Sequence, residues 1–422
     1  MKRLALLLVT ALALPWACSK DSPAPTPAPD PQAAILAEGP WRAEVQQGDV
    51  SLPFNFAVSA TADGYEVIYL NGPERMPVEQ VRFAPDGRLE LNFPSYSAEL
   101  IAHVDGPRMS GTIRLPRKNS VTELPFTAEH GQDWRFFPEA AAEFEDFTGR
   151  WEVSITVEKF NFTQPAVALF NQQGPMLSGT VNTQVGDYRF LHGEVRGGEL
   201  YLSTFDGSGT QLWRAALQPD GSLKGKFYSV TYGEAVWTAT RNPDFQLEDP
   251  TTLTYMKPGY EKLEFSLPDL DGQLVSLDDP RYDGKVVLVV LGGTWCPSCH
   301  DEAQFMVPFE QAYGDQGLEV VYIMFEYSDD FAESEAQLRA FKKRYQVDHP
   351  ILFAGESSRE SRGEKLPMLN DILAFPTTLF VDRGGKVRRI HTAFPGPATG
   401  QEHEDYKREF RAFVEMLLAE TA

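Results

Sequence analysis

Residues 285–302 read KVVLVVLGGTWCPSCHDE, and this stretch decides the fold of the C-terminal part of the chain. Lys285 to Leu291 is an almost continuous apolar run, which is the pattern of a strand buried on both faces. Two glycines end the run, and Cys296 and Cys299 follow closely. From about Ser298 to Tyr313 apolar residues recur at helical spacing, at Ala303, Met306, Val307, Phe309 and Ala312. The pattern predicts a strand-to-helix turn with Cys296 at the start of the helix.

The start of a helix is a favourable place for a reactive cysteine. The thiolate is the reactive form of cysteine, and the unpaired N–H groups and partial positive charge of a helix N-terminus stabilise an anion. The C-x-x-C spacing brings the sulfur of Cys299 back over the first turn, close enough to form a disulfide with Cys296. We therefore expect Cys296 to attack a substrate disulfide and Cys299 to resolve the mixed disulfide.

Two motifs in this part of the chain resemble those of the thioredoxin superfamily, especially the membrane-anchored, TlpA-like disulfide reductases of bacteria. They are Gly-Thr-Trp-Cys-x-x-Cys at 293–299 and Phe-Pro-Thr-Thr at 375–378. The resemblance covers roughly residues 261–422 and implies an α/β thioredoxin-like domain there. The predicted elements follow in the right order: a strand at 318–326, a helix at 332–345, a strand at 379–382, a Gly-Gly turn at 384–385, a strand at 386–390 and a closing helix at 405–418.

The resemblance also implies roles for single residues. In that family the proline that matches Pro376 has a cis peptide bond and faces the redox pair. The carboxylate that matches Glu302, three residues after the second cysteine, takes part in proton transfer. Trp295 is expected to pack in the core and to form a hydrophobic wall beside the thiol, whereas His300 is expected to be solvated. No cofactor and no metal site are expected.

Several alternatives stay open at this point. The Pro-Ser dipeptide between the cysteines differs from the Gly-Pro of thioredoxin, so the direction of electron flow is not fixed, although a reductase is favoured. Cys299-His300 completes a C-x-x-C-H haem-attachment pattern and could also supply two zinc ligands. A thiol peroxidase would place its threonine three residues before the reactive cysteine, whereas Thr294 lies two before Cys296. The insertion at 355–366 is predicted to be a surface loop near the site.

Residues 39–245 have the pattern of an all-β region, with short strands between Asp-Gly and Gly-Gly turns. Sequence similarities recur at offsets of about 110–114 residues, such as Gly-Pro-Trp at 39–41 and Gly-Arg-Trp at 149–151. We therefore expect two tandem antiparallel modules, at 39–137 and 147–245, each of about eight strands in a barrel or a sandwich. Only residues 138–144 suggest a helix. A proline-punctuated linker at 246–260 precedes the last domain.

The first residues have the pattern of an export signal. Lys2 and Arg3 precede an apolar run from Leu4 to Leu14, which is too short to span a bilayer, and a small residue then precedes Cys18. Residues 1–18 are interpreted as a lipoprotein signal with Cys18 as the lipidated residue. Alternating prolines within the linker 19–38 favour an extended tether.

These features predict a protein outside the cytoplasm that is lipid-anchored to a bacterial membrane, at its periplasmic face or at the cell surface. The chain has three cysteines in 422 residues, so a lipidated Cys18 leaves only the pair Cys296 and Cys299. We expect this pair to be chemically reactive rather than a structural disulfide. The net charge of −22 argues against a nucleic-acid partner. The expected partners are protein thiols and disulfides and an upstream redox donor. In a competing hypothesis, the β modules carry a binding function and the redox domain is an accessory.

Overall fold

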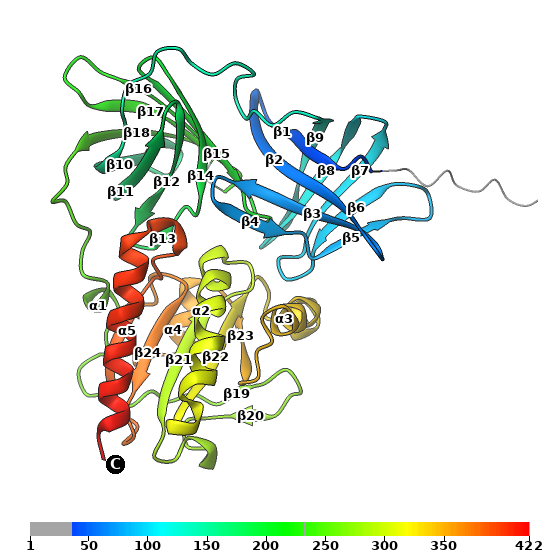
Figure 1. Cartoon of the computed structure of the whole chain (residues 1–422). Helices are drawn as coiled ribbons and strands as arrows, with labels where there is room; N and C mark the ends of the chain where they lie inside the picture. Colours follow the sequence, from blue (N-terminus) through cyan, green and yellow to red (C-terminus); the bar gives the residue numbers. More distant parts are fainter. Residues whose placement is uncertain (1–35, 232, 422) are drawn as a thin grey trace, which may run out of the picture. The chain divides into compact units, whose positions relative to one another are not determined.

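The structure is a computed structural model that describes residues 36–231 and 233–421 (Figure 1). The predicted signal sequence, Cys18 and most of the proline-rich tether lie outside the described residues. Among the described residues, none of the helices combines the length and the apolar character needed to cross a membrane.

β module 1 is a single antiparallel sheet of nine strands that curves into an open half-barrel. Its strands are β1 (Gly39–Gln47), β2 (Val50–Thr61), β3 (Gly64–Asn71), β4 (Glu74–Pro77), β5 (Gln80–Phe83), β6 (Leu89–Phe93), β7 (Ala98–Asp105), β8 (Arg108–Arg117) and β9 (Ser120–His130). They are ordered β4-β3-β2-β1-β9-β8-β7-β6-β5, so β4 and β5 are the two edges. Alternating apolar residues line the inner face, among them Trp41, Phe54 and Phe126.

β module 2 repeats the arrangement as a closed barrel, because β11 pairs with both β10 and β12. Its strands are β10 (Gly149–Val157), β11 (Phe162–Gln173), β12 (Met176–Thr183), β13 (Gly186–Asp187), β14 (Leu191–Arg196), β15 (Glu199–Phe205), β16 (Thr210–Leu217), β17 (Leu223–Ser229) and β18 (Gly233–Arg241). Three buried tryptophans, Trp151, Trp213 and Trp237, fill the interior with aliphatic neighbours. Residues 138–144, for which a helix was considered, are not helical.

The two modules share the same local geometry where their sequences repeat. Gly39 and Gly149 begin β1 and β10 with φ angles of +112° and +115°, which favour glycine. The indole N–H of Trp41 donates to the carbonyl of Ala37, and that of Trp151 donates in the same way four residues back, each at 2.9 Å. This agreement supports the predicted duplication.

Arg135, which follows β9, joins the two modules. Its side chain is buried and donates hydrogen bonds to the carbonyl of Leu70 in β3 (2.5 Å) and to that of Ser203 in β15 (2.8 Å). Burial lowers the pKa of Arg135 to about 9, because water no longer solvates the guanidinium. A buried charge held by carbonyls of both modules makes Arg135 a structural bridge.

The C-terminal part is an α/β unit with a central sheet of order β23-β22-β21-β24-β25, in which β21, β22 and β23 are parallel. Its strands are β21 (Val286–Gly292), β22 (Leu318–Glu326), β23 (Ile351–Glu356), β24 (Thr377–Val381) and β25 (Val387–Thr392), beside the small hairpin of β19 (Leu267–Pro268) and β20 (Leu274–Val275). Its helices are α1 (Pro250–Leu253), α2 (Pro297–Tyr313), α3 (Phe331–Tyr345), α4 (Arg359–Lys365) and α5 (Gln401–Ala419).

Both faces of this sheet are covered, as the continuous apolar run in β21 predicted. Alternate residues of β21 pack on one side against α2, α3 and α5, and on the other side against the segments around Phe265 and Met368. Figure 1 shows α2 and α5 running alongside the central strands. The predicted strand at 318–326 is β22, and the three predicted helices are α2, α3 and α5. The insertion at 355–366 is not purely a loop, because α4 forms in it.

Candidate redox site

The redox site is built where β21 ends and α2 begins. Pro297 occupies the first turn of α2, where a missing N–H is tolerated, so the helix starts directly after Cys296. Cys296 is the N-cap residue, and its Sγ atom accepts a hydrogen bond of 3.3 Å from the main-chain N–H of Cys299. The predicted position of Cys296 at the helix start is confirmed.

Both cysteines are free thiols with little exposure. Cys296 is 6% exposed and Cys299 is 4% exposed. Burial, followed by the hydrogen bond with Cys296, raises the pKa of Cys299 well above its usual value. Cys299 therefore stays protonated at neutral pH until a partner accepts its proton.

The loop before β24 lies directly against Cys296. The peptide bond between Phe375 and Pro376 is cis, as the family resemblance implied, and the Cys296 thiol donates to the carbonyl oxygen of Phe375 at 3.3 Å. The ring of Phe375 meets Trp295 edge to face, with ring centroids 5.8 Å apart. Trp295 is partly buried and donates its indole N–H to the carbonyl of Phe325 (2.9 Å), so it belongs both to the core edge and to the wall of the site.

The insertion at 355–366 reaches this loop. Arg362 of α4 donates to the carbonyl of Ile372 at 2.6 Å, and its guanidinium lies 5.4 Å from the ring centroid of Phe375. The insertion therefore lies near the site, as the sequence suggested, because Arg362 contacts Phe375.

Glu302 is buried under the redox pair. It accepts a hydrogen bond of 2.6 Å from the hydroxyl of Thr378, the second residue of β24. Burial raises the pKa of Glu302 to about 8, and the bond from Thr378 only partly opposes this shift. Glu302 also acts electrostatically on Cys299, which raises the pKa of that thiol further. A carboxyl group with this pKa can exchange a proton near neutral pH.

A second buried carboxylate, Glu326, was not predicted from the sequence. It ends β22 and accepts hydrogen bonds from the main-chain N–H (3.0 Å) and the hydroxyl (2.7 Å) of Thr294. Burial raises the pKa of Glu326 to about 7. The parallel pairing of β21 and β22 brings their carboxyl ends together, which is the signal that could have identified it. Glu326 fixes the turn before Cys296.

The expectation that His300 is solvated is wrong. The side chain is 1% exposed, with Nε2 at 2.7 Å from the carbonyl oxygen of Thr294 and Nδ1 at 2.7 Å from the hydroxyl of Tyr345. Burial moves the pKa of His300 well below its usual value, so the ring is neutral. His300 therefore fixes the turn and does not supply charge.

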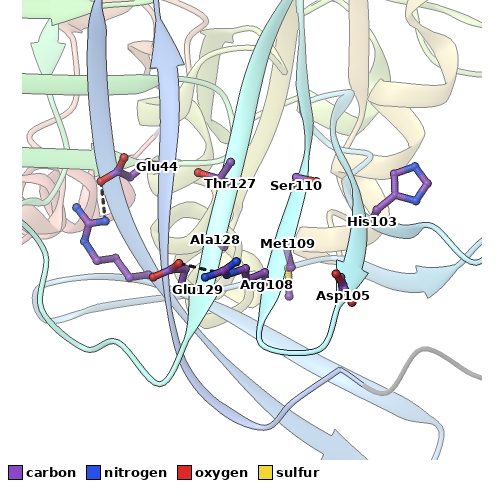
Figure 2. A pocket seen from close by; sticks show the side chains of 10 residues that line it. Glu44, His103, Asp105, Arg108, Met109, Ser110, Thr127, Ala128 and Glu129 are labelled. Carbon is purple, nitrogen blue, oxygen red and sulfur yellow. Dashed lines mark ion pairs between the residues drawn. The ribbon is translucent and has the colours of Figure 1, made fainter.

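A hollow of about 570 Å³ lies elsewhere, on β module 1 (Figure 2). It is lined by side chains of β1, β7, β8 and β9, including His103, and by two ion pairs, Arg42–Glu44 at 2.6 Å and Arg108–Glu129 at 3.6 Å. These carboxylates are matched by cations, and no cysteine lines the hollow. Thiol chemistry therefore belongs to the Cys296 site.

A C-x-x-C pair at a strand-to-helix turn, facing a cis-proline loop on this sheet, defines an oxidoreductase with a thioredoxin fold. The Redoxin family model matches residues 243–408. The thioredoxin-like protein YneN of Bacillus subtilis is 32% identical over 149 residues, which are 35% of this chain and 78% of that protein. The thiol–disulfide oxidoreductase ResA of Bacillus thuringiensis subsp. konkukian is 25% identical over 36% of this chain and 79% of its own length.

The chain belongs to the thioredoxin-like family. Among solved structures, a thiol:disulfide interchange protein from Chlorobium tepidum matches 38% of this chain and 96% of its own, with 21% identity and a TM-score of 0.29.

Proposed function

We propose that this protein exchanges disulfides with other proteins outside the cytoplasm, chiefly in the direction of reduction, through Cys296 and Cys299. The observation that carries the proposal is the position of Cys296. Its sulfur caps α2 and accepts the N–H of Cys299, so a negative charge on that sulfur meets a preformed donor.

The exchange has two steps. The Cys296 thiolate attacks one sulfur of a substrate disulfide, which forms a mixed disulfide and releases the other substrate sulfur as a thiolate. Cys299 then loses its proton and attacks the Cys296 sulfur, which forms the Cys296–Cys299 disulfide and releases the second substrate thiol. Two electrons pass to the substrate, so a thiol donor must reduce the pair again before the next turnover.

Glu302 is proposed to take the proton of Cys299 in the second step. Cys299 needs a base because burial keeps it protonated, and Glu302 is the carboxylate that acts on it. A pKa of about 8 places Glu302 close to the balance point for proton transfer at neutral pH. Pro376 and Phe375 are proposed to form the edge on which the substrate chain lies, because the Phe375 carbonyl already meets the Cys296 thiol.

The location is proposed from the first 18 residues, which have the order of a lipoprotein signal that ends before Cys18. A labelled fatty acid should attach to the protein expressed in a bacterium, and Cys18→Ala should abolish the label. A mature protein that begins at another residue and carries no lipid contradicts this part of the proposal.

The activity is tested by the reduction of insulin with dithiothreitol as the thiol donor, followed as turbidity. The full chain should accelerate precipitation over dithiothreitol alone, and Cys296→Ser should remove the acceleration. Equal rates with the full chain and with Cys296→Ser contradict the proposal.

A further inference from the structure

Both β modules contact the first turn of the redox helix. Tyr96, from the turn after β6, stacks on His300 with ring centroids 3.8 Å apart and an angle of 21° between the rings. Arg189, from the segment after β13, lies 3.0 Å from Asp301 and 2.7 Å from Glu74 of β4. The two residues that follow Cys299 are therefore held by side chains from outside the thioredoxin-like unit.

These contacts are part of a packed interior. Tyr96, Arg189, His300 and Asp301 are each between 1% and 7% exposed. The start of β13 also lies against the redox motif itself, since a Cβ atom placed at Gly186 would stand 3.2 Å from the hydroxyl of Ser298. Loss of one partner from this buried ion pair would leave a buried charge uncompensated, which makes separation of the modules from α2 costly.

The hairpin between β8 and β9 approaches the site from the Trp295 side. Tyr327 stacks on Trp295 with centroids 5.4 Å apart, and the positive charge of Arg117, at the end of β8 in this hairpin, partly opposes the rise that burial causes in the pKa of Tyr327. The next residue, Lys118, forms an ion pair with Glu356 at the end of β23. On the side of the cis-proline loop, by contrast, Leu373 remains 44% exposed.

We infer that the two β modules form a wall of the redox site and set its selectivity. In this arrangement Cys296 is reached only by disulfides carried on small molecules or on narrow, extended chain segments, which enter along the side of Leu373. Large folded proteins with a disulfide in a broad surface are excluded, because attack needs a substrate sulfur in line with a thiol that is only 6% exposed. Tyr96 and Lys118 are the specificity-determining residues. This inference rests on the proposed function.

Access to Cys296 can be measured without turnover by labelling the reduced full chain with two maleimides. One is N-ethylmaleimide, the other is joined by a short linker to the surface of a folded protein that has no cysteine, and each rate is divided by its rate with a free cysteine peptide. Labelling is assigned to Cys296 by mass spectrometry. The bulky reagent should be slower by about tenfold or more, because it reacts only with the fraction of molecules in which the wall is open.

Three full-chain variants test the wall. Lys118→Glu breaks the exposed contact with Glu356, and Tyr96→Ala removes the stacking on His300; both should raise the normalised rate of the bulky reagent several-fold and leave N-ethylmaleimide unchanged. Tyr96→Phe keeps an aromatic ring against His300, so it should exclude the bulky reagent as the wild type does. Arg108→Glu is the matched control, a charge reversal in an exposed hairpin of the same module, and should match the wild type.

The inference would be overturned if the two maleimides label Cys296 of the wild type at equal normalised rates. It would also be overturned if the ratio of these two rates is unchanged in both Lys118→Glu and Tyr96→Ala. Because Lys118 is exposed at the surface, its variant remains informative even where Tyr96→Ala fails to fold. A protein that excludes the bulky maleimide but reduces neither insulin nor the disulfide of a short, extended peptide would instead contradict the proposed function alone.

Discussion

The hydroxyl of Thr378 donates a hydrogen bond of 2.6 Å to one oxygen of Glu302, and the other oxygen of this carboxyl group has no hydrogen-bond partner among the described residues. A buried carboxyl with one oxygen satisfied favours its protonated form. The relationship connects the strand after the cis-proline loop to the helix that carries the cysteines. It also makes Glu302 a group whose charge depends on pH near neutrality.

The first prediction concerns stability against pH. Glu302 has a pKa of about 8 in the folded protein and about 4.3 when unfolded. Between these values the folded state holds a proton that the unfolded state has released, so the free energy of unfolding falls as pH rises from about 4.3 to about 8. Glu302→Gln removes the contribution of this carboxyl group to the pH dependence of stability. Urea unfolding at several pH values should show the wild type losing up to about 5 kcal/mol more than the variant across this range.

Burial also raises the pKa values of Asp301 and Glu326 to about 7, so these two groups lower the free energy of unfolding with rising pH in the same way. Both groups are present in the wild type and in the variant. The comparison therefore depends on the difference between wild type and Glu302→Gln. Parallel stability profiles for the two proteins would show that Glu302 is not the buried acid described here.

The second prediction concerns the resolving step. If Glu302 accepts the proton of Cys299, Glu302→Gln should slow the release of the mixed disulfide by about a hundredfold or more, within the range of a general base. Formation of the mixed disulfide at Cys296 should change little. Quenched-flow samples with a peptide disulfide, separated after acid trapping, measure both steps. Slowing of the first step alone would argue against this role.

The third prediction concerns Arg135. Arg135→Met leaves the carbonyls of Leu70 and Ser203 buried without this donor, at about 1–3 kcal/mol for each unsatisfied group. The urea midpoint should fall clearly, with a loss of roughly 3 kcal/mol of stability. Arg108→Met removes an exposed ion pair and should stay within about 0.5 kcal/mol of the wild type. Equal midpoints for the two variants would contradict the bridging role.

Local patterns predicted the elements that carry the redox pair. The apolar run, the glycines and the helical spacing placed Cys296 at a helix start, and the structure confirms this position. The all-β region was also predicted, because strand alternation and turn residues are local signals. The sequence did not predict whether each module closes into a barrel. β module 2 closes because β11 pairs with β12, whereas β module 1 stays open because its edge strands β4 and β5 do not pair.

The remaining residues of the site depend on contacts that no local pattern reveals. Glu326 lies 32 residues after Thr294 and meets it only through strand pairing. Tyr96 and Arg189 are 93 residues apart and come together only where both modules pack on α2. The environment of His300 was misjudged for the same reason, because the first turn of a helix is usually solvated and here two modules cover it.

The assignment of Cys296 as the attacking cysteine is tested most directly by trapping. Cys299→Ser, incubated in reduced form with the disulfide of an extended peptide, should accumulate a mixed disulfide that mass spectrometry places on Cys296, because the resolving thiol is missing. Cys296→Ser should trap little under the same conditions, since Cys299 is buried and protonated. A partner that is linked to Cys299 in the Cys296→Ser protein as fast as to Cys296 in the Cys299→Ser protein would contradict the account.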